Sequence, residues 1–496
     1  MGLSFQSTRI SIAAVSVLLA GGCAVGPNFK KPAAPDADAY AVSPVATAGT
    51  AGVRGGEAQR FLRGADLSAD WWTLFHSAPL NALIEHSLAS NPDLKAAQAA
   101  LSAAREGVLA QRGAYYPGVS GSLSASRQRQ AGTLAPAPAS NVDLYNLFTP
   151  EVSVAYVPDL FGLNRRTVES LQAQTEAVRF QMIATYNTLT ANVVVTAIQQ
   201  GSVQLQIEAT RELIDINTRS LQILRLQSDK GYASGLDVAA QESQLAQVAA
   251  TLPPLIKQAA QLHDLMATLA GEFPGQAGAG NFELTSLELP QDLPVSVPAD
   301  LVRQRPDVRQ AEADLHAASA KIGIAVANRL PNVTLSAATG STALAVNQLL
   351  TSGTGFWSVG ADLTAPIFQG GALLHQERGA KAAYEQAAAQ YRSTVLAACQ
   401  NVADTLAALE EDAEELKAAA AAADAARSTL DLAQRQWQGG YASYLTLLSA
   451  EQAYQQSRIA LVQAQASRYA DTAALFQALG GGWWHRQALS AGSHEQ

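Results

Sequence analysis

The sequence predicts an α+β membrane protein made of two copies of one unit, each with a pair of strands followed by a long helical hairpin. Three observations support this fold class. A turn motif occurs twice, the spacing of apolar residues changes twice from helical to alternating, and two very long stretches rich in Ala, Gln and Leu contain no proline. Repeats decide the architecture of a chain, so the duplication constrains every later assignment.

The duplicated motif is Gly-Tyr-Ala-Ser, and each copy interrupts a long helical stretch. Its glycine can adopt the left-handed conformation that ends a helix, and its serine can cap the next helix. Each copy therefore predicts the tight turn of an antiparallel helical hairpin. The turn residues are Gly231, Tyr232 and Ser234 in the first copy and Gly440, Tyr441 and Ser443 in the second.

Other landmarks recur in the same order at nearly constant spacing. Asn91-Pro92-Asp93 is matched by Arg305-Pro306-Asp307, and Tyr116-Pro117 by Leu330-Pro331. Ordered matches of this kind are rare by chance. We therefore treat the chain as a tandem repeat.

The N-terminus has the layout of a secretory signal. Arg9 precedes an apolar run, Ile10 to Ala20, that is too short to serve as a membrane anchor. The run ends in Gly21-Gly22-Cys23, which resembles the bacterial lipobox, although Ala20 stands where Leu is usual. We expect residues 1–22 to be removed and Cys23 to carry N-acyl and S-diacylglycerol lipid. A plain signal peptide is the alternative.

The predicted organisation of the mature chain follows from these landmarks. A Pro-, Ala- and Gly-rich segment is too poor in large apolar residues to fold alone, so it predicts an extended, partly mobile strap. The segments are a lipidated strap at 23–70, the first repeat at 71–271, a connector at 272–298, the second repeat at 299–482 and a mobile C-terminal tail at 483–496.

Alternating apolar residues predict two strands in each repeat, followed by hairpins at 163–269 and 372–479. The strands are expected at about 118–127, 150–158, 332–340 and 356–365. Their length suits membrane-crossing strands, although ordinary soluble hairpins show the same alternation. At about 1.5 Å per residue, the first helix of each hairpin could reach about 100 Å.

Four strands from one chain cannot stand in a bilayer, because the open edges would leave backbone groups without hydrogen bonds in hydrocarbon. Two chains would supply eight strands, which fill their own interior, whereas twelve strands from three chains leave room for water. If the strands lie in the membrane, a trimeric conduit follows.

Composition and motifs argue against several other functions. The formal net charge is −9 and only 15% of residues are charged, so there is no basic surface for nucleic acid. The seven histidines are scattered, and no nucleophile elbow, phosphate loop or metal-binding cluster is present. Besides Cys23 the only cysteine is Cys399, so no disulfide is expected. We expect no enzymatic activity, no metal and no cofactor apart from the lipid.

Several motifs together resemble the outer membrane factor family, and within it the NodT-type lipoprotein branch related to TolC. They are the Cys23 to Phe29 segment, Trp71-Trp72 with Phe75, the two Gly-Tyr-Ala-Ser turns and the Leu479 to Trp483 terminus. The resemblance covers nearly all of the mature chain. It implies a homotrimer with a 12-stranded barrel in the outer membrane and a periplasmic α-helical barrel. It also implies that a periplasmic adaptor and an inner-membrane transporter, most often of the RND type, drive export of drugs or other toxic small molecules.

In that family, acidic rings just past the hairpin turns narrow the periplasmic end. Carried over by position, Asp237 matches the acidic place in the first turn, whereas Thr446 stands there in the second. The resemblance thus implies one gate ring, from Asp237. An ordinary helix-start carboxylate is the alternative role for Asp237. For the whole chain, a periplasmic adaptor lipoprotein with a single helical hairpin is the alternative function.

Overall fold

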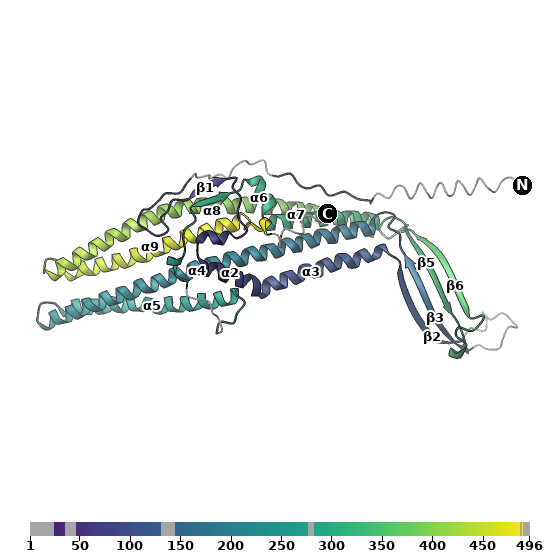
Figure 1. The fold of residues 1–496 in the computed structure, drawn as a ribbon, viewed down its shortest axis with the longest axis horizontal. Helices are drawn as coiled ribbons and strands as arrows, with labels where there is room; N and C mark the ends of the chain where they lie inside the picture. Colours follow the sequence, from purple (N-terminus) through teal and green to yellow (C-terminus); the bar gives the residue numbers. More distant parts are fainter. Residues whose placement is uncertain (1–23, 35–45, 130–143, 276–281, 487–488, 490–496) are drawn as a thin grey trace. The chain divides into compact units, whose positions relative to one another are not determined.

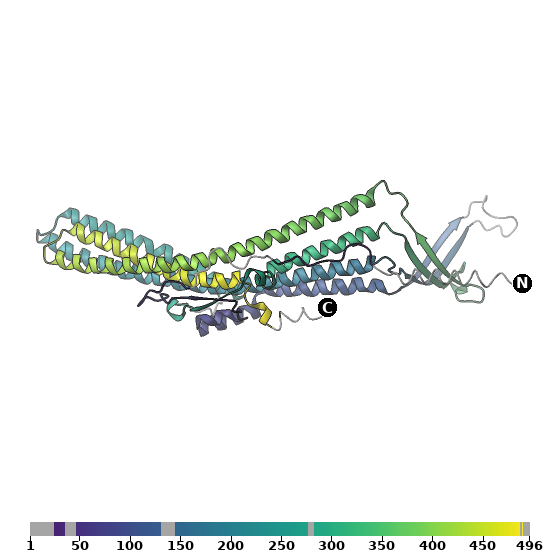
Figure 2. The same cartoon turned by 90° about the horizontal axis from the view of Figure 1, so that it is seen from above.

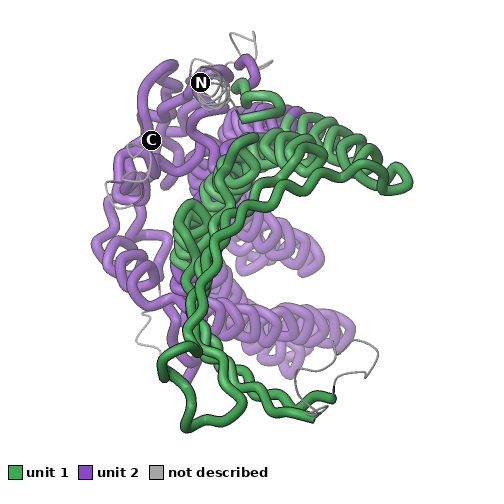
Figure 3. The backbone as a smooth tube through the Cα atoms, turned by 90° about the vertical axis from the view of Figure 1, so that its right-hand side faces the viewer, with its two compact units in different colours: residues 1–31, 101–178, 311–391 green, residues 32–100, 179–310, 392–496 purple. Residues whose placement is uncertain are grey.

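The structure is a computed structural model that describes residues 24–34, 46–129, 144–275, 282–486 and 489. The predicted signal peptide and Cys23 lie outside these residues. The chain divides into two compact units, each built from three segments of the sequence (Figure 3). Unit 1 comprises residues 1–31, 101–178 and 311–391, and unit 2 comprises residues 32–100, 179–310 and 392–496. Each unit therefore takes segments from both repeats.

Unit 1 contains a four-stranded antiparallel sheet with the order β2-β3-β5-β6. The strands are β2 (Gly118–Arg129), β3 (Leu144–Tyr156), β5 (Asn332–Ser341) and β6 (Gly355–Thr364). Three of them lie within two residues of the predicted ranges. β3 starts six residues earlier than predicted, because Pro150 interrupts the strand signal; proline is uncommon inside a paired strand.

All helices that adjoin the sheet meet it at the same end (Figure 1). β2 follows α3 (Pro92–Arg112), and β5 follows α7 (Pro306–Ala327). β3 leads into α4 (Leu163–Asp229), and β6 leads into α8 (Ala372–Gln438). At the opposite end, the described residues form the connection between β5 and β6, which includes the short 3-10 helix η4 (Val346–Gln348). Across the described residues, no helix combines the length and the apolar character needed to cross a membrane.

The chain forms two long hairpins, α4 with α5 (Gly235–Leu269) and α8 with α9 (Tyr444–Ala478) (Figure 2). Unit 2 holds α5 and α9 whole, together with residues 179–229 of α4 and 392–438 of α8. Both pairs run where the sequence predicts them, and their bounds differ by at most two residues. One apolar cluster joins the hairpins near their turns; it includes Leu213 and Leu224 of α4, Val248 of α5, Trp437 of α8 and Leu447 of α9. The two repeats thus share a core.

The strap is more ordered than predicted. β1 (Arg60–Arg63) pairs in parallel with β4 (Asp292–Val295) of the connector, and neither strand was expected. The fully buried Arg468 of α9 donates hydrogen bonds to the Gly55 carbonyl over 2.7 Å and to Gln59 Oε1 over 3.1 Å. The strap has too few apolar residues to fold alone, but distant polar partners fix residues 46–64. The prediction of a partly mobile strap is wrong for this part.

The prediction of a mobile tail from 483 is also wrong for its first residues. Trp483 is 6% exposed, and its indole N–H donates to the Gln304 carbonyl over 2.6 Å. Arg486 donates a hydrogen bond to the Tyr186 hydroxyl. The chain reverses through Gly480–Gly482, so these side chains return to the surface of unit 2. The tryptophans could have indicated that this segment packs against the protein, but the three glycines before them favoured a mobile end.

Short helical elements complete the described chain. They are η1 (Trp71–Phe75), α2 (Ala78–Ser90), η2 (Gly113–Tyr115), η3 (Leu284–Ser286), α6 (Pro298–Gln304), η4 (Val346–Gln348) and η5 (Trp483–His485). Trp71 and Phe75 of η1 pack against Phe476 of α9 with ring centroids 5.4 and 6.4 Å away. The aromatic motif at 71–75 is therefore a packing anchor.

Candidate functional site

The two hairpin turns have the predicted backbone. Gly231 and Gly440 take φ values of 78° and 76°. In each turn the glycine N–H and the following tyrosine N–H close two hydrogen bonds of 2.8 to 3.0 Å onto the last carbonyls of the helix, which is the Schellman motif. The motif requires a left-handed residue, and glycine supplies it without steric strain.

Ser234 and Asp237 form a capping box at the start of α5. Ser234 Oγ accepts a hydrogen bond from the Asp237 N–H over 3.1 Å, and Asp237 Oδ2 accepts from the Ser234 N–H over 3.1 Å. Asp237 is exposed and also accepts from Ser234 Oγ over 2.7 Å. Its carboxylate therefore has a structural role in each chain.

The second turn lacks this box. Ser443 occupies the N-cap position of α9, but its side chain makes no hydrogen bond to the backbone. Its hydroxyl instead lies 3.0 Å from the Thr446 hydroxyl. The replacement of a carboxylate by Thr446 thus changes the cap as well as the charge, and the two turns are not equivalent.

Both turns expose large side chains at equivalent positions. Tyr232 and Leu236 are 82% and 79% exposed, and Tyr441 and Leu445 are 90% and 63% exposed. Tyr444 differs, because it is buried and its hydroxyl donates a hydrogen bond to Gln241 Oε1. Each chain therefore presents two apolar and aromatic tips, while Tyr444 holds the hairpins together.

A polar network, buried at Glu451 and Ser220 and exposed at Gln452, lies behind the tips and links the hairpins. Ser220 Oγ donates to Glu451 Oε1 over 3.0 Å, and Gln452 Nε2 donates to Gln244 Oε1 over 2.9 Å. Glu451 is 1% exposed, and its Oε2 makes no hydrogen bond within the described part of the chain. Burial raises the pKa of Glu451, although hydrogen bonds from Ser220 and Gln241 act in the opposite direction. Sequence reasoning missed this network because no local pattern marks it.

A pair of carboxyl groups, Asp412 of α8 and Asp471 of α9, joins these two helices. Burial, followed by the neighbouring carboxyl of Asp471, raises the pKa of Asp412 to about 7. Glu415 adds to the effect and Arg468 opposes it. One proton shared between two close carboxyls is the usual consequence of such an arrangement.

One face of the four-stranded sheet is apolar over most of its length. The strand register places side chains of alternate residues on the same face. The apolar face carries Val119, Gly121, Leu123 and Ala125 of β2, Phe148, Pro150, Val152, Val154 and Tyr156 of β3, Val333, Leu335, Ala337 and Thr339 of β5, and Trp357, Val359, Ala361 and Leu363 of β6. Such a band, with aromatic residues within it, is typical of a surface that contacts lipid.

The opposite face is polar and small along most of its length, with Tyr145, Leu147 and Phe356 at the end farther from the helices. It carries Ser120, Ser122, Ser124, Ser153, Ser336 and Ser358, together with the carboxylates Glu151 and Asp362. This face can line water. Sequence reasoning recognised the alternation but not the two acidic residues on it, although strand parity alone would have identified them.

The segment that follows Cys23 is docked on unit 1. The Val25 N–H donates to the Phe161 carbonyl over 3.1 Å, and the buried Arg166 guanidinium donates to the Val25 carbonyl over 3.0 Å and to Asn28 Oδ1 over 2.8 Å. Phe29 stacks on His316 with ring centroids 4.4 Å apart. The first described residues therefore lie at the turn between β3 and α4.

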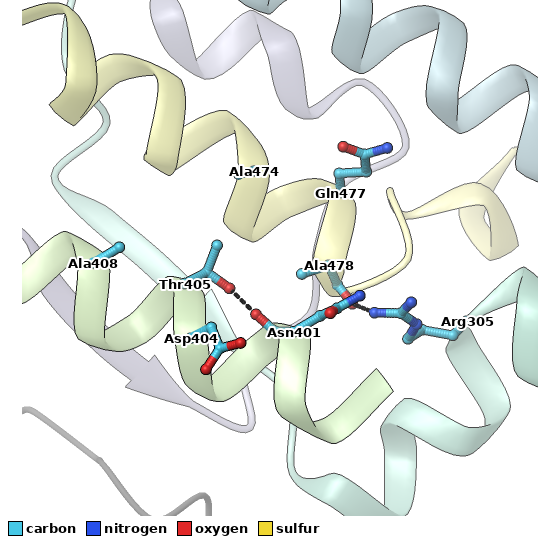
Figure 4. Close-up of a pocket in the computed structure, with 8 residues that line it drawn as sticks. All are labelled: Arg305, Asn401, Asp404, Thr405, Ala408, Ala474, Gln477 and Ala478. Carbon is cyan, nitrogen blue, oxygen red and sulfur yellow. Dashed lines mark hydrogen bonds between the residues drawn. The ribbon is translucent and has the colours of Figure 1, made fainter. Parts of the chain in front are cut away.

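A surface groove of about 450 Å³ is lined by α8, the end of α9 and Arg305 (Figure 4). Arg305 is already engaged, since it pairs with Asp307 over 2.6 Å and donates to the Ala478 carbonyl over 3.0 Å. Within the described ranges, no group of three or more His, Cys, Asp or Glu residues could hold a metal ion. The groove has the features of a helix junction rather than of a built ligand site.

A sheet with one lipid-compatible face and one polar face, joined to two helical hairpins, defines the protomer of an outer-membrane channel. Residues 83–272 and 297–481 match the family model described as outer membrane efflux protein, and the chain belongs to this family. An antibiotic efflux pump outer membrane protein, ArpC, and a toluene efflux pump outer membrane protein, TtgC, both from Pseudomonas putida, are each 30% identical over 481 aligned positions. Each match covers 95% of this chain and 95% of the relative. The solved structure of the outer-membrane channel OprN is 29% identical, with a TM-score of 0.82 over 93% of this chain and 100% of that one.

The chain is therefore the outer-membrane component of an efflux pump, and it extends into the periplasm. It has the TolC-like tandem fold that the sequence predicts, and it is a channel rather than an enzyme. The alternative of a periplasmic adaptor is wrong, because the relatives that match along nearly the whole chain are outer-membrane proteins.

Proposed function

We propose that three copies of this chain form a passive conduit with a 12-stranded barrel in the outer membrane. The observation that carries the proposal is the four-stranded sheet, whose end strands β2 and β6 each have a partner on one side only among the described strands. In hydrocarbon these edges must pair with other copies. Twelve strands leave a water-filled interior, which the polar face would line.

The state of assembly can be tested by native mass spectrometry of protein extracted from outer membranes, combined with conductance in planar bilayers. The expected result is a trimer that forms open or gated pores. A monomer or dimer that produces no conductance contradicts the proposal.

We propose that the cargo is drugs or other toxic small molecules. Two relatives are named for antibiotics and toluene, and small polar groups on the inward face of the sheet offer little means of selection. An inner-membrane transporter, of the RND type in our proposal, would select the cargo. Deletion of the gene, with its transporter retained, should sensitise the cell to the compounds that the transporter exports.

The exposed tips are our candidate surface for the periplasmic adaptor. Tyr232 and Leu236 on one hairpin and Tyr441 and Leu445 on the other offer aromatic and apolar groups at equivalent positions. Replacement of all four by serine should weaken co-purification of the adaptor while the trimer persists. Unchanged co-purification excludes this surface.

We propose that Asp237 contributes a ring of three carboxylates at the periplasmic end. The test must separate charge from capping, because Asp237 also closes the capping box with Ser234. Asp237→Ala removes both the charge and the cap, whereas Ser234→Ala weakens the cap and keeps the charge. A rise in conductance and a loss of cation preference in Asp237→Ala alone support the gate. Equal behaviour of the two variants assigns Asp237 to capping.

We propose that Cys23 carries the lipid anchor. Support comes from the docked segment, because Val25 is held at the turn between β3 and α4, where strands give way to helices. Mass spectrometry of the mature N-terminus tests the proposal, and the Cys23→Ala variant should lose the added acyl mass. An unmodified Cys23 in the wild-type protein contradicts it.

A further inference from the structure

The charged residues of the four strands are divided between the two faces of the sheet. Glu151 and Asp362 lie on the polar face, whereas Arg127 and Arg129 of β2 share the face of Val119 and Leu123. Both arginines are exposed. Within the described strands, the apolar face therefore carries only positive charge, and all of it lies at one end of β2.

That end points away from the helices. β2 begins directly after η2 and ends at Arg129, and α3, α4, α7 and α8 all adjoin the sheet at the other end (Figure 1). Because the helices belong to the periplasmic side of an outer-membrane efflux protein, Arg127 and Arg129 lie toward the cell exterior.

The height of the two arginines can be estimated from strand geometry. They follow Val119 by eight and ten positions, or about 27 and 34 Å along the strand. With a strand tilt of about 40°, this becomes about 21 to 26 Å along the membrane normal, whereas the apolar band of such barrels is about 25 Å tall. The guanidinium groups therefore lie at the outer edge of the band.

This position suits a specific class of ligand. Arginine is strongly unfavourable at the bilayer midplane but is tolerated near the interface, where its long side chain can reach the head groups. A guanidinium group binds phosphate through two parallel hydrogen bonds. Two arginines on alternate residues of one strand project from the same face, so they can engage one head group together.

We propose that Arg127 and Arg129 bind the phosphate groups of lipid in the outer leaflet, which in an outer membrane belong to lipopolysaccharide. The inference rests on the proposed trimeric barrel and adds a ligand to its outer surface. Three such sites would surround each trimer. The second repeat has no counterpart, because the corresponding ends of β5 and β6 carry Ser341 and Gly355.

The test compares binding of purified lipopolysaccharide and of its dephosphorylated form to the detergent-solubilised trimer, with native mass spectrometry to count bound lipid. The Arg127→Gln/Arg129→Gln variant should bind lipopolysaccharide about tenfold more weakly than the wild type, as expected for the loss of charge-assisted pairs. The wild type should bind the dephosphorylated form as weakly as the variant does. Inorganic phosphate should not compete at equal concentration.

The control is Arg211→Gln/Lys257→Gln, which removes the same charge from exposed positions on α4 and α5. It should bind lipopolysaccharide like the wild type. Equal binding by the Arg127→Gln/Arg129→Gln variant and the wild type, or equal loss in the control, overturns the proposal. Trimer mass and conductance are measured on the same samples, so that failure of the barrel itself is distinguished from failure of lipid binding.

Discussion

Ser220 of α4 donates a hydrogen bond to Glu451 of α9 over 3.0 Å, and this contact joins the first hairpin to the second. Glu451 is buried at the interface, and its second oxygen has no hydrogen-bond partner among the described residues. A carboxyl in such a place favours its neutral form. The connection between the hairpins is therefore sensitive to proton concentration.

The first prediction concerns the pH dependence of this contact. Since folding raises the pKa of Glu451, its stabilising contribution is complete at low pH and is lost as pH rises through the raised value. Between pH 5 and pH 8 the melting temperature of the wild type should fall more than that of Glu451→Gln. The difference should be about 2–4 °C for each kcal/mol of folding stability that ionisation of Glu451 removes. Circular dichroism of the detergent-solubilised protein measures this. Parallel curves for the two proteins would show that Glu451 stays ionised throughout.

The second prediction concerns Asp412. Its pKa of about 7 means that stability is lost as pH rises from below about 4 through about 7, because the ionised pair with Asp471 becomes unfavourable. Asp412→Asn should flatten the dependence of the melting temperature on pH between pH 4 and pH 7. Asp424→Asn, an exposed change on the same helix, is the control and should follow the wild type. If both variants behave alike, the pair does not titrate in this range.

The third prediction concerns the hairpin turns. Gly231→Ala and Gly440→Ala place a β-carbon on a left-handed residue and should each destabilise their hairpin by about 1–2 kcal/mol. Gly235→Ala is the matched control, since it lies in the first turn of α5 with ordinary φ and nothing within 4 Å of the added carbon. Hydrogen exchange at the tips should increase in the first two variants only. Equal exchange in all three would mean that the turn geometry adapts freely.

The fourth prediction concerns the docked N-terminal segment. A β-carbon on Gly26 would meet Gly323 Cα at 2.4 Å, and Gly26 also has a φ of 90°. Gly26→Ala should therefore release the segment and speed trypsin cleavage after Lys30, whose side chain is exposed but whose backbone is held in the docked segment. Gly107→Ala, on an open face of α3 in the same unit, should leave the cleavage rate unchanged. An unaltered rate in Gly26→Ala would show that the docked segment tolerates the shift.

The sequence was sufficient to locate the hairpins and three of the strands because local chemistry sets their ends. Gly231 and Ser234 stop and start helices by themselves, and the alternation beside Pro117 and Pro331 marks strand starts. The remaining features depend on distant partners. β1 forms only against β4, and the burial of Glu451 depends on Ser220, which lies 231 positions away. No local pattern carries that information.

The pairing of β3 with β5 crosses from the first repeat to the second. Translation of the first half alone would leave β3 with one bare edge, and the shared core near the turns would lack Trp437 and Leu447. The ancestral unit of the duplication has thus lost its independence, and a premature stop codon in the second half should yield an aggregating fragment rather than a smaller pore.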